Sequence, residues 1–423
     1  MPQSLGRDAQ SSIFRAGASG IRPRVPASWA ALEASARRAM SREAWAYVAG
    51  SAGRETTAEA NHAAFDRVSI VPRVLRDVAE RDLSVEIFGR TYPAPIVLQP
   101  VGVLGIVHRD ADLAVARAAA GAGLPFVYSN QASVPMESVA EVGGPHWFQL
   151  YWSTSDDLVA SLVSRAEASA AEAIVVTLDT HVLGWRPRDL DLGYLPFVHG
   201  QGIAQYTSDP VFRSLVAERM RQPRTGERPR VTPTAVRTLL EMTRRYPGPA
   251  AEARAAVETF VDVFSRSSLT WADLAFLRDR TSLPIVLKGI QHPDDARLAI
   301  DHGVDGIVVS NHAGRQLDGA IGSLDALPAV VEAVEGRIPV ILDSGVRGGS
   351  DIVKALALGA TAVGIGRAYA YGLAVAGEAG VAEVLRNLVA ELDLSLAVSG
   401  RASIRDLSAA DLSPLPVSPG SRA

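Results

Sequence analysis

Residues 339–366 read PVILDSGVRGGSDIVKALALGATAVGIG and contain a complete strand–helix–strand unit. The runs PVILDS (339–344) and AVGIG (362–366) are short, apolar and rich in β-branched residues, which predicts two buried strands. Between them SDIVKALALGA has helical spacing, begins at a Ser-Asp cap and ends near Gly359. Because parallel strands need a crossover helix of this kind, the stretch predicts a parallel sheet covered by helices.

The same alternation of strand and helix recurs along the chain. Helical patterns such as ADLAVARAAAGAG, DDLVASLVSRAEASA and HPDDARLAIDHG follow apolar runs. Eight units of this kind predict the α/β class and a closed (β/α)8 TIM barrel, with an open doubly wound sheet as the alternative. The six strand candidates before residue 339 are PIVLQ (95–99), PFVYS (125–129), WFQLY (147–151), AIVVTLD (173–179), PIVLK (284–288) and GIVVSN (306–311).

Four segments lie outside this alternation. Residues 1–28, rich in Ser, Gly, Arg and Pro, are expected to form a flexible arm. Residues 29–92 are expected to form a helical cap with a hairpin made by VSIVPRVL and LSVEIFG. Residues 186–268, which include RQPRTGERPRVTP, follow the fourth strand and predict a lid, because so long a connection is usually functional. Residues 411–423 are expected to be a flexible tail, and residues 29–410 a single barrel domain.

Composition excludes several classes of site. The 423 residues carry 42 Lys and Arg against 46 Asp and Glu, for a formal net charge of −4, and no cysteine. The lack of cysteine excludes disulfides, thiolate metal sites, iron–sulfur clusters and cysteine nucleophiles. The charge balance gives little reason to expect nucleic-acid or membrane partners, and no HxH or HExxH metal spacing occurs. The N-terminal residues lack the apolar region of a signal peptide, so a cytoplasmic protein is expected.

Polar groups follow every predicted strand at its carboxyl end. In a barrel these ends meet at one face, where catalysis takes place, so the sequence predicts an active site there. The residues at these ends are Gln99 with Pro100, Val101 and Gly102; Ser129 and Asn130; Gln149 and Tyr151; Thr177 and Asp179; Lys288; Ser310, Asn311 and His312; Asp343 and Ser344; and Gly366 with Arg367.

The seventh and eighth strand ends predict a phosphate site. DSGVRGGSD and GIGRA both combine glycines, which let backbone amides approach an anion, with an arginine. Barrels frequently bind phosphate at these two ends, beside a helix N-terminus. No GxxxxGK[ST] motif occurs, which argues against an ATP-binding P-loop.

His312 is the predicted general base, because it follows an apolar strand and lies three residues before Arg315. Asp179 could hold the other ring nitrogen of His312, and Arg186 could supply a second guanidinium for a carboxylate. Lys288 could be a cation beside an electron-rich ring or a Schiff-base nucleophile. His181 is the next candidate for the base.

With these residues in place, the chain resembles the FMN-dependent α-hydroxy-acid oxidase family from about residue 47 to residue 406. The resemblance is carried by YVAGSAGRETTAEAN, PVGVLGI, WFQLY, VVTLDT, LPIVLKG, IVVSNHAGRQLD, IPVILDSGVRGGSDIVKALALGA and IGRAYAYGLAVAGEAGV. Within the family, PAPIVLQPVGVLGI, GWRPRDLDLGYLPF and the long insertion are most similar to lactate 2-monooxygenase. The chain departs from the usual pattern at Gln99, Asn130, Gln131, His181 and Ala313, the last of which stands where the family usually has glycine.

The resemblance implies a role for each matched residue. His312 would be the base, supported by Asp179, and Tyr151 would contact the substrate hydroxyl, while Tyr47, Arg186 and Arg315 would bind the carboxylate. FMN would be the cofactor, with Lys288 near its pyrimidine edge. The other implied cofactor residues are Pro100, Val101, Gly102, Ser129, Gln149, Thr177, Ser310, Asp343, Ser344, Gly345, Val346, Arg347, Gly366 and Arg367.

The implied reaction is oxidation of a short L-2-hydroxy acid with dioxygen as the electron acceptor. The expected activity is lactate 2-monooxygenase, which converts lactate and dioxygen to acetate, carbon dioxide and water. The alternatives are a 2-hydroxy-acid oxidase that releases the keto acid and hydrogen peroxide, and, from another class, a Lys288 Schiff-base aldolase. The family also implies a homo-oligomer, either a tetramer or an octamer.

Overall fold

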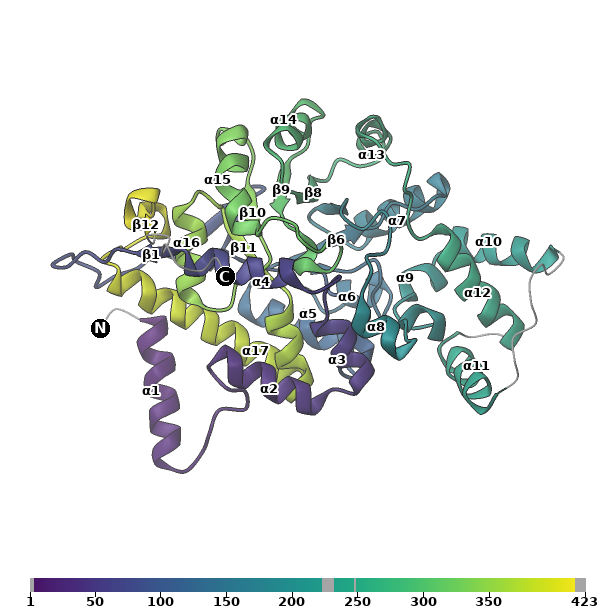
Figure 1. Cartoon of the computed structure of the whole chain (residues 1–423), viewed down its shortest axis with the longest axis horizontal. Coiled ribbons are helices and arrows are strands. Elements are labelled where there is room, and N and C mark those ends of the chain that lie inside the picture. The colour runs from purple at the N-terminus through teal and green to yellow at the C-terminus, as the bar shows by residue number, and fades with distance from the viewer. Residues whose placement is uncertain (1–3, 223–231, 247–248, 415–423) are drawn as a thin grey trace, which may run out of the picture.

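The computed structural model describes residues 4–222, 232–246 and 249–414, and its centre is a closed barrel of eight parallel strands. Every predicted strand is present, and the barrel closes where β11 pairs with β4. The TIM barrel is therefore confirmed over the open sheet (Figure 1). The barrel strands are β4 (Ile96–Leu98), β5 (Phe126–Tyr128), β6 (His146–Leu150), β7 (Ile174–Thr177), β8 (Ile285–Ile290), β9 (Gly306–Val309), β10 (Val340–Leu342) and β11 (Ala362–Ile365).

Helices surround the barrel and bury the outward faces of its strands. Because both faces of each strand are covered, the strands are almost wholly apolar and buried. The predicted crossover helices form, but their caps lie before the predicted ones: α16 begins after Gly348 rather than at the Ser-Asp pair, and α7 is capped by Ser155, which accepts a hydrogen bond from Leu158 N. The surrounding helices are α5 (Ala111–Ala122), α6 (Met136–Ala140), α7 (Asp156–Ala168), α13 (Leu274–Arg278), α14 (Pro293–Asp301), α15 (Ser323–Val334), α16 (Gly349–Ala357) and α17 (Arg367–Val398).

The N-terminal cap contains α2 (Trp29–Ala39), α3 (Arg42–Ala49) and α4 (Thr56–Asp66), as predicted, but the expected hairpin is wrong. Its first half, β1 (Val68–Ile70), pairs with β12 (Leu412–Pro414) from the far end of the chain. Its second half, β2 (Val85–Ile87), instead pairs with β3 (Arg90–Tyr92). The two turn residues between β2 and β3, Phe88 and Gly89, both have positive φ, as a tight two-residue hairpin turn requires.

The N-terminal segment also differs from expectation, because Leu5–Ala18 form helix α1 rather than a flexible arm. Figure 1 shows α1 projecting from the body of the molecule beside α17. Its first turn is held by Asp393 of α17, which accepts a hydrogen bond from Gly6 N at 2.8 Å. Glycine is required there, since an added Cβ would lie 2.4 Å from Leu394 Cγ. Part of the predicted tail is likewise ordered as β12, and residues 415–423 lie outside the described residues.

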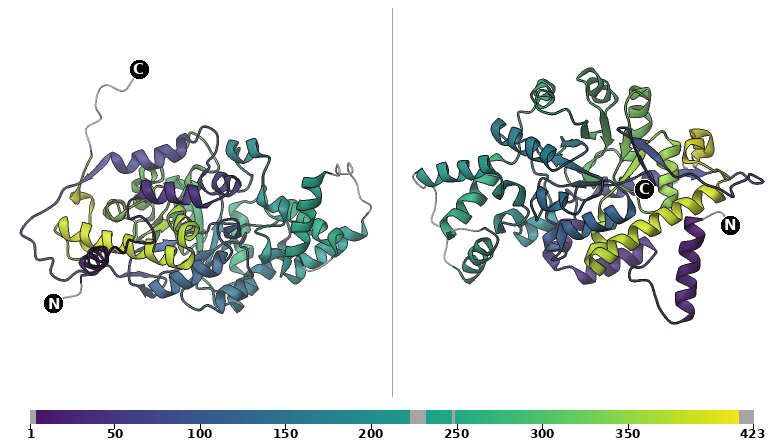
Figure 2. Two further views of the ribbon diagram at one scale, coloured as in Figure 1. Left: turned by 90° about the horizontal axis from the view of Figure 1, so that it is seen from below. Right: turned by 180° about the vertical axis from the view of Figure 1, so that it is seen from behind.

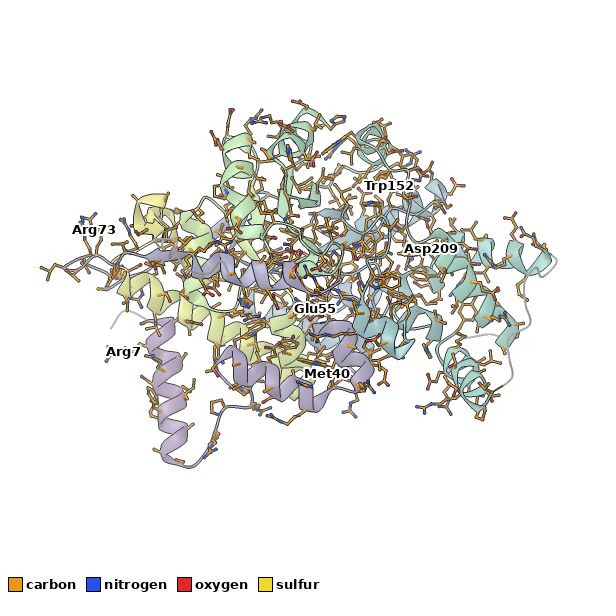
Figure 3. The ribbon with its side chains drawn as sticks, viewed as in Figure 1. Arg7, Met40, Glu55, Arg73, Trp152 and Asp209 are labelled. Carbon is orange, nitrogen blue, oxygen red and sulfur yellow. The ribbon has the colours of Figure 1, made fainter. Side chains whose placement is uncertain are left out.

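The predicted lid after β7 is helical in its described part. Figure 2 shows its outer helices as a lobe beside the barrel. Asp209, labelled in Figure 3, is fully buried and joins this lobe to the barrel by accepting hydrogen bonds from Ser161 Oγ and Arg165 Nη1. Most of RQPRTGERPRVTP lies outside the described residues. The lid helices are α8 (Pro187–Leu192), α9 (Ala204–Thr207), α10 (Pro210–Arg221), α11 (Pro233–Arg245) and α12 (Ala250–Val263).

Among the described helices, none combines the length and the apolar character that crossing a membrane would require.

The anchor of α1 predicts a large loss of stability when Asp393 is replaced. Arg81 Nε donates to Asp393 Oδ1 at 2.6 Å, and both side chains are at least nine-tenths buried. Asp393→Ala would leave the Arg81 guanidinium buried without its partner, so we expect the free energy of unfolding to fall by about 3–5 kcal/mol. Urea unfolding measures this loss. Asp8→Ala, on the exposed side of α1, is the control and should change stability by less than about 0.5 kcal/mol.

Candidate active site

A cavity opens at the carboxyl ends of the barrel strands, between the N-terminal cap and the near part of the lid. The base candidate, the carboxylate-binding candidates and both glycine-arginine loops all line it. Ser129, Gln149, Thr177 and Ser310 are buried residues outside the lining, and the partly buried Asp179 contacts the lining residue His312. The predicted residues in the lining are Tyr47, Pro100, Val101, Gly102, Tyr151, Arg186, Lys288, His312, Arg315, Asp343, Ser344, Gly345, Val346, Arg347, Gly366 and Arg367.

His312 and Asp179 form a hydrogen-bonded pair across the ends of β9 and β7. His312 Nδ1 lies 2.8 Å from Asp179 Oδ1, and Thr180 Oγ1 donates to the same carboxylate oxygen at 3.0 Å. A carboxylate can only accept, so Nδ1 carries the proton and Nε2 is the nitrogen that can act on a ligand in the cavity. The geometry therefore suits His312 as a general base.

The surroundings keep this base neutral near pH 7. Burial lowers the pKa of His312, the Asp179 carboxylate raises it, and the Lys288 ammonium lowers it again, so that it ends below its usual value. Burial alone would raise the pKa of Asp179, but His312 and Lys288 more than offset this and hold it at about 2. A neutral imidazole beside an ionised carboxylate is the state that a proton acceptor requires.

The backbone that presents His312 is strained. His312 and Ala313 both have φ of 55°, in the left-handed region that favours glycine. Ala313 is held there by hydrogen bonds, because its N–H donates to Ser344 Oγ at 2.9 Å and its carbonyl accepts from Ser51 Oγ and Arg367 Nη1. This explains why glycine usually occupies the position of Ala313 in the family that the sequence resembles.

Arg186 and Arg315 lie together at the substrate end of the cavity. Arg186 Nε donates to Arg315 O at 3.1 Å, and Arg186 Nη2 donates to Gln316 Oε1 at 2.5 Å. Arg315 donates to the carbonyls of Tyr47 and Gly50, with its guanidinium 5.0 Å from the centre of the Tyr47 ring. Burial and the nearby Arg315 lower the pKa of Arg186 to about 10, so Arg186 remains charged at neutral pH. Two adjacent cations, Arg186 buried and Arg315 half-buried, can bind a carboxylate.

Lys288 forms a buried ion pair with Asp343. Its Nζ lies 3.2 Å from Asp343 Oδ2 and donates to Ser310 Oγ at 2.9 Å. Burial lowers the pKa of Lys288, but the carboxylates of Asp343 and Asp179 raise it by more, so the net shift is upward. A Schiff-base lysine needs a neutral amine with a lowered pKa, so the site argues against the aldolase alternative.

The residues behind the cavity have the unused polar groups that a flavin ring needs. Gln149 Oε1 accepts hydrogen bonds from Ser129 Oγ and Asn130 N, which leaves Gln149 Nε2 buried without a partner among the described residues. Thr177 Oγ1 is buried and unpartnered in the same way. Together with the Lys288 ammonium, these groups can satisfy the polar edge of an isoalloxazine ring.

The other end of the cavity holds the two glycine-arginine loops. The Arg347 guanidinium makes no hydrogen bond or ion pair in the described structure. Arg367, by contrast, donates hydrogen bonds to the carbonyls of Val48, Gly50 and Ala313. Most of its N–H groups are therefore already paired with the loops around the site. The residues present therefore fit FMN, with Arg347 as the arginine that is available for its phosphate.

Several lining residues were not predicted from the sequence. Thr180 and Phe197 line the substrate end, and Trp29, His62 and Tyr371 line the other end. His181 is exposed, and its Nδ1 contacts Leu178 O at 3.2 Å, outside the cavity lining. Thr180 could have been inferred from its position beside Asp179, whereas the others come from distant segments.

A family model for FMN-dependent dehydrogenases matches residues 36–414. The chain belongs to this family. L-lactate oxidase of Lysinibacillus sphaericus is 42% identical over 384 residues, which cover 90% of this chain and 91% of that protein. 4-Hydroxymandelate oxidase of Amycolatopsis orientalis is 37% identical, with coverage of 89% and 95%. A crystal structure of mandelate oxidase with (S)-4-hydroxymandelic acid aligns with a TM-score of 0.76 and 36% identity, over 92% of this chain and 98% of that one.

Membership in the FMN-dependent dehydrogenase family gives the cofactor and the general chemistry. The chain is an FMN-dependent oxidoreductase that oxidises 2-hydroxy acids. The His312–Asp179 pair, the two arginines and the flavin-compatible polar groups lie in one cavity, in agreement with that chemistry.

The electrostatics of His312 predict how the rate of flavin reduction depends on pH. The neutral imidazole is the active form, so the rate should fall as the pH drops through the pKa of His312, below its usual value of about 6.5. Asp179→Asn removes the charge that raises this pKa, so the acid limb should move to lower pH. The plateau rate should fall by roughly 100-fold, because the imidazolium loses its counter-ion.

Anaerobic stopped-flow bleaching of the flavin across a pH series measures both effects. Thr180→Val is the control, since it removes the hydrogen bond to Asp179 but leaves the charge, so the limb should stay where it is. A limb that moves to higher pH in Asp179→Asn would contradict the assigned role of Asp179.

Proposed function

We propose that this protein is a lactate 2-monooxygenase, which converts L-lactate and dioxygen to acetate, carbon dioxide and water. The observation that carries the proposal is the placement of the His312–Asp179 pair and two neighbouring arginines, Arg186 and Arg315, in one cavity whose wall is completed by the lid. A hydroxyl group next to a carboxylate is the substrate chemistry that this combination recognises.

The carboxylate of the substrate is bound by Arg186 and Arg315, and Tyr47 and Tyr151 line the same cavity. Burial and the nearby Asp179 carboxylate raise the pKa of the Tyr151 hydroxyl, so it stays protonated and donates to the substrate oxygen. His312 Nε2 accepts the proton that the substrate loses, and Asp179 stabilises the resulting imidazolium. FMN, when bound, takes up the two electrons and passes them to dioxygen.

The lid supports retention of the keto acid, on which the monooxygenase outcome depends. Phe197 belongs to the lid, lines the cavity, and its ring centre lies 6.4 Å from that of Tyr47. Phe260 of α12 packs behind Phe197 at 5.1 Å between ring centres. A wall built from packed aromatic rings slows the escape of a small product. If the keto acid stays until dioxygen has taken up the two electrons, the hydrogen peroxide so formed would oxidise it within the site to acetate, carbon dioxide and water.

A 2-hydroxy-acid oxidase is the second candidate. Relatives of this chain include proteins named L-lactate oxidase and 2-hydroxyacid oxidase, which favours release of the keto acid with hydrogen peroxide. The two candidates share every step up to the loss of the proton and electrons from the substrate. They differ only in whether the keto acid leaves before dioxygen reacts.

The ratio of acetate to pyruvate during turnover of lactate in air separates the two candidates. Catalase is included so that free peroxide cannot decarboxylate pyruvate outside the site. We expect mainly acetate. Mainly pyruvate would overturn the monooxygenase and leave the oxidase, and flavin reduction only by a larger 2-hydroxy acid would overturn lactate as the substrate.

Gly102 provides a second prediction, because the family resemblance places it against the flavin. A Cβ added at Gly102 would lie 3.3 Å from both Cβ and Oε1 of Gln131, so Gly102→Ala crowds the cavity against this side chain. We expect the product ratio to shift toward pyruvate. The Gly102→Ala, Gln131→Ala double variant removes the contact with Oε1 but keeps the Cβ of residue 131, so it should recover part of the acetate. If Gly102→Ala leaves the ratio unchanged, crowding at this position does not control the outcome.

A further inference from the structure

Aromatic residues from outside the strand-end loops close the phosphate end of the cavity. Trp29 is the first residue of α2, and its ring centre lies 5.6 Å from that of Tyr371 on α17. Trp45 of α3 stacks on Tyr371 from elsewhere in the cap, also at 5.6 Å. Figure 1 shows α2 lying against α17, and Trp29 and Tyr371 both line the cavity with Arg347 and Arg367. Trp29 precedes the family-matched residues 36–414, so the family match assigns it no role.

The indole nitrogen of Trp29 is a buried donor without an acceptor. Trp29 Nε1 has no hydrogen-bond partner among the described residues, although its atom surface is closed to solvent. An indole N–H can only donate, so the missing partner must be an acceptor. A buried donor without an acceptor is unfavourable, and a ligand oxygen in the cavity would remove that cost.

The ring of Trp29 also supports the available arginine. The Arg347 guanidinium carbon lies 4.8 Å from the Trp29 ring centre, within the range of a cation–π interaction. Glu33, one helical turn along α2, lines the same end of the cavity and places a negative charge there. Glu33 repels a phosphate at this end of the cavity. The N–H group of Trp29 and the Arg347 cation would both attract one and so oppose that repulsion.

We propose that Trp29 is a phosphate-binding residue for FMN, donating from Nε1 to a phosphate oxygen while its ring holds Arg347 in place. The proposal rests on the FMN cofactor that the family assigns. It extends the phosphate site from the two glycine-arginine loops to the N-terminal cap. Helix α2 thereby becomes part of the cofactor site as well as part of the scaffold.

Binding of FMN and of riboflavin to the apoprotein tests this role, because riboflavin has the same ring and ribityl chain but no phosphate. Trp29→Phe keeps an aromatic ring beside Arg347 and removes the N–H. A hydrogen bond to a charged group corresponds to about 10- to 100-fold in affinity, so the Kd for FMN should rise by that factor. The Kd for riboflavin should change by less than about twofold. Both constants are measured from quenching of flavin fluorescence.

Three further variants sharpen the test. Trp45→Phe is the matched control, since Trp45 stacks on the same tyrosine but does not line the cavity, and it should leave both constants unchanged. Trp29→Leu also removes the support of Arg347 and should weaken FMN binding further. Trp29→His restores a ring N–H and should recover part of the loss.

Circular dichroism and the melting temperature of each apoprotein show whether it is folded. Equal weakening of FMN and riboflavin by Trp29→Phe, or no weakening of either, would overturn the proposal. Wild-type apoprotein that binds no FMN would instead contradict the cofactor assignment, so the two failures are distinguishable. If Trp29→Phe does not fold, the same comparison of FMN with riboflavin in Trp29→Leu, which also lacks the N–H, decides the question.

Discussion

Closure of the barrel between its first and last strands is the constraint on which the site depends. Gln99 N donates to Ile365 O at 2.8 Å, and Val363 N donates to Pro95 O at 2.9 Å, so residues far apart in sequence become neighbours. This pairing brings Val101 beside Gly366, where an added Cβ would lie 3.5 Å from Val101 Cγ2. The loop of Gly102 and the arginine loops after β10 and β11 therefore share one cavity. In an open sheet these edges would lie far apart, and no single cofactor could contact both.

The barrel and most of the site could be predicted from the sequence because their signals are local. A buried parallel strand must be apolar along its length, and the polar residue at its carboxyl end must lie at the face of the barrel where all these ends meet. The sequence of each strand therefore predicts which residue that strand contributes to the site. The pairing of His312 with Asp179 followed from this rule, although the two are 133 positions apart. The closed barrel fixes the positions of the strand ends, so few long-range assumptions were needed.

The incorrect or missing predictions involve contacts between distant segments, which no local sequence pattern encodes. β1 looks like half of a hairpin, yet it pairs with β12 more than 300 residues later, because the chain ends return to the same side of the barrel. Helix α1 depends on the buried Asp393, and Trp29 acquires its place only through Tyr371 and Arg347. Gln99 was identified as a departure from the family pattern, but its contact with β11 was not predicted. It fills the space beside Gly364, where an added Cβ would lie 2.4 Å from Gln99 Cγ.

The two carboxylates of the site keep two neighbouring groups in different protonation states. Asp343 lies against Lys288 and keeps it charged, while His312 stays neutral beside Asp179, because burial and, to a smaller extent, the charges of Lys288 and Arg186 lower the pKa of His312. A bound carboxylate substrate would neutralise part of the charge at Arg186, and the pKa of His312 would then rise. The base would thus become a better proton acceptor when a substrate of the correct charge is present. A neutral analogue of the substrate, which lacks the carboxylate, would leave the pKa of His312 low. The cationic groups that bind the carboxylate therefore also make proton removal depend on the presence of that carboxylate.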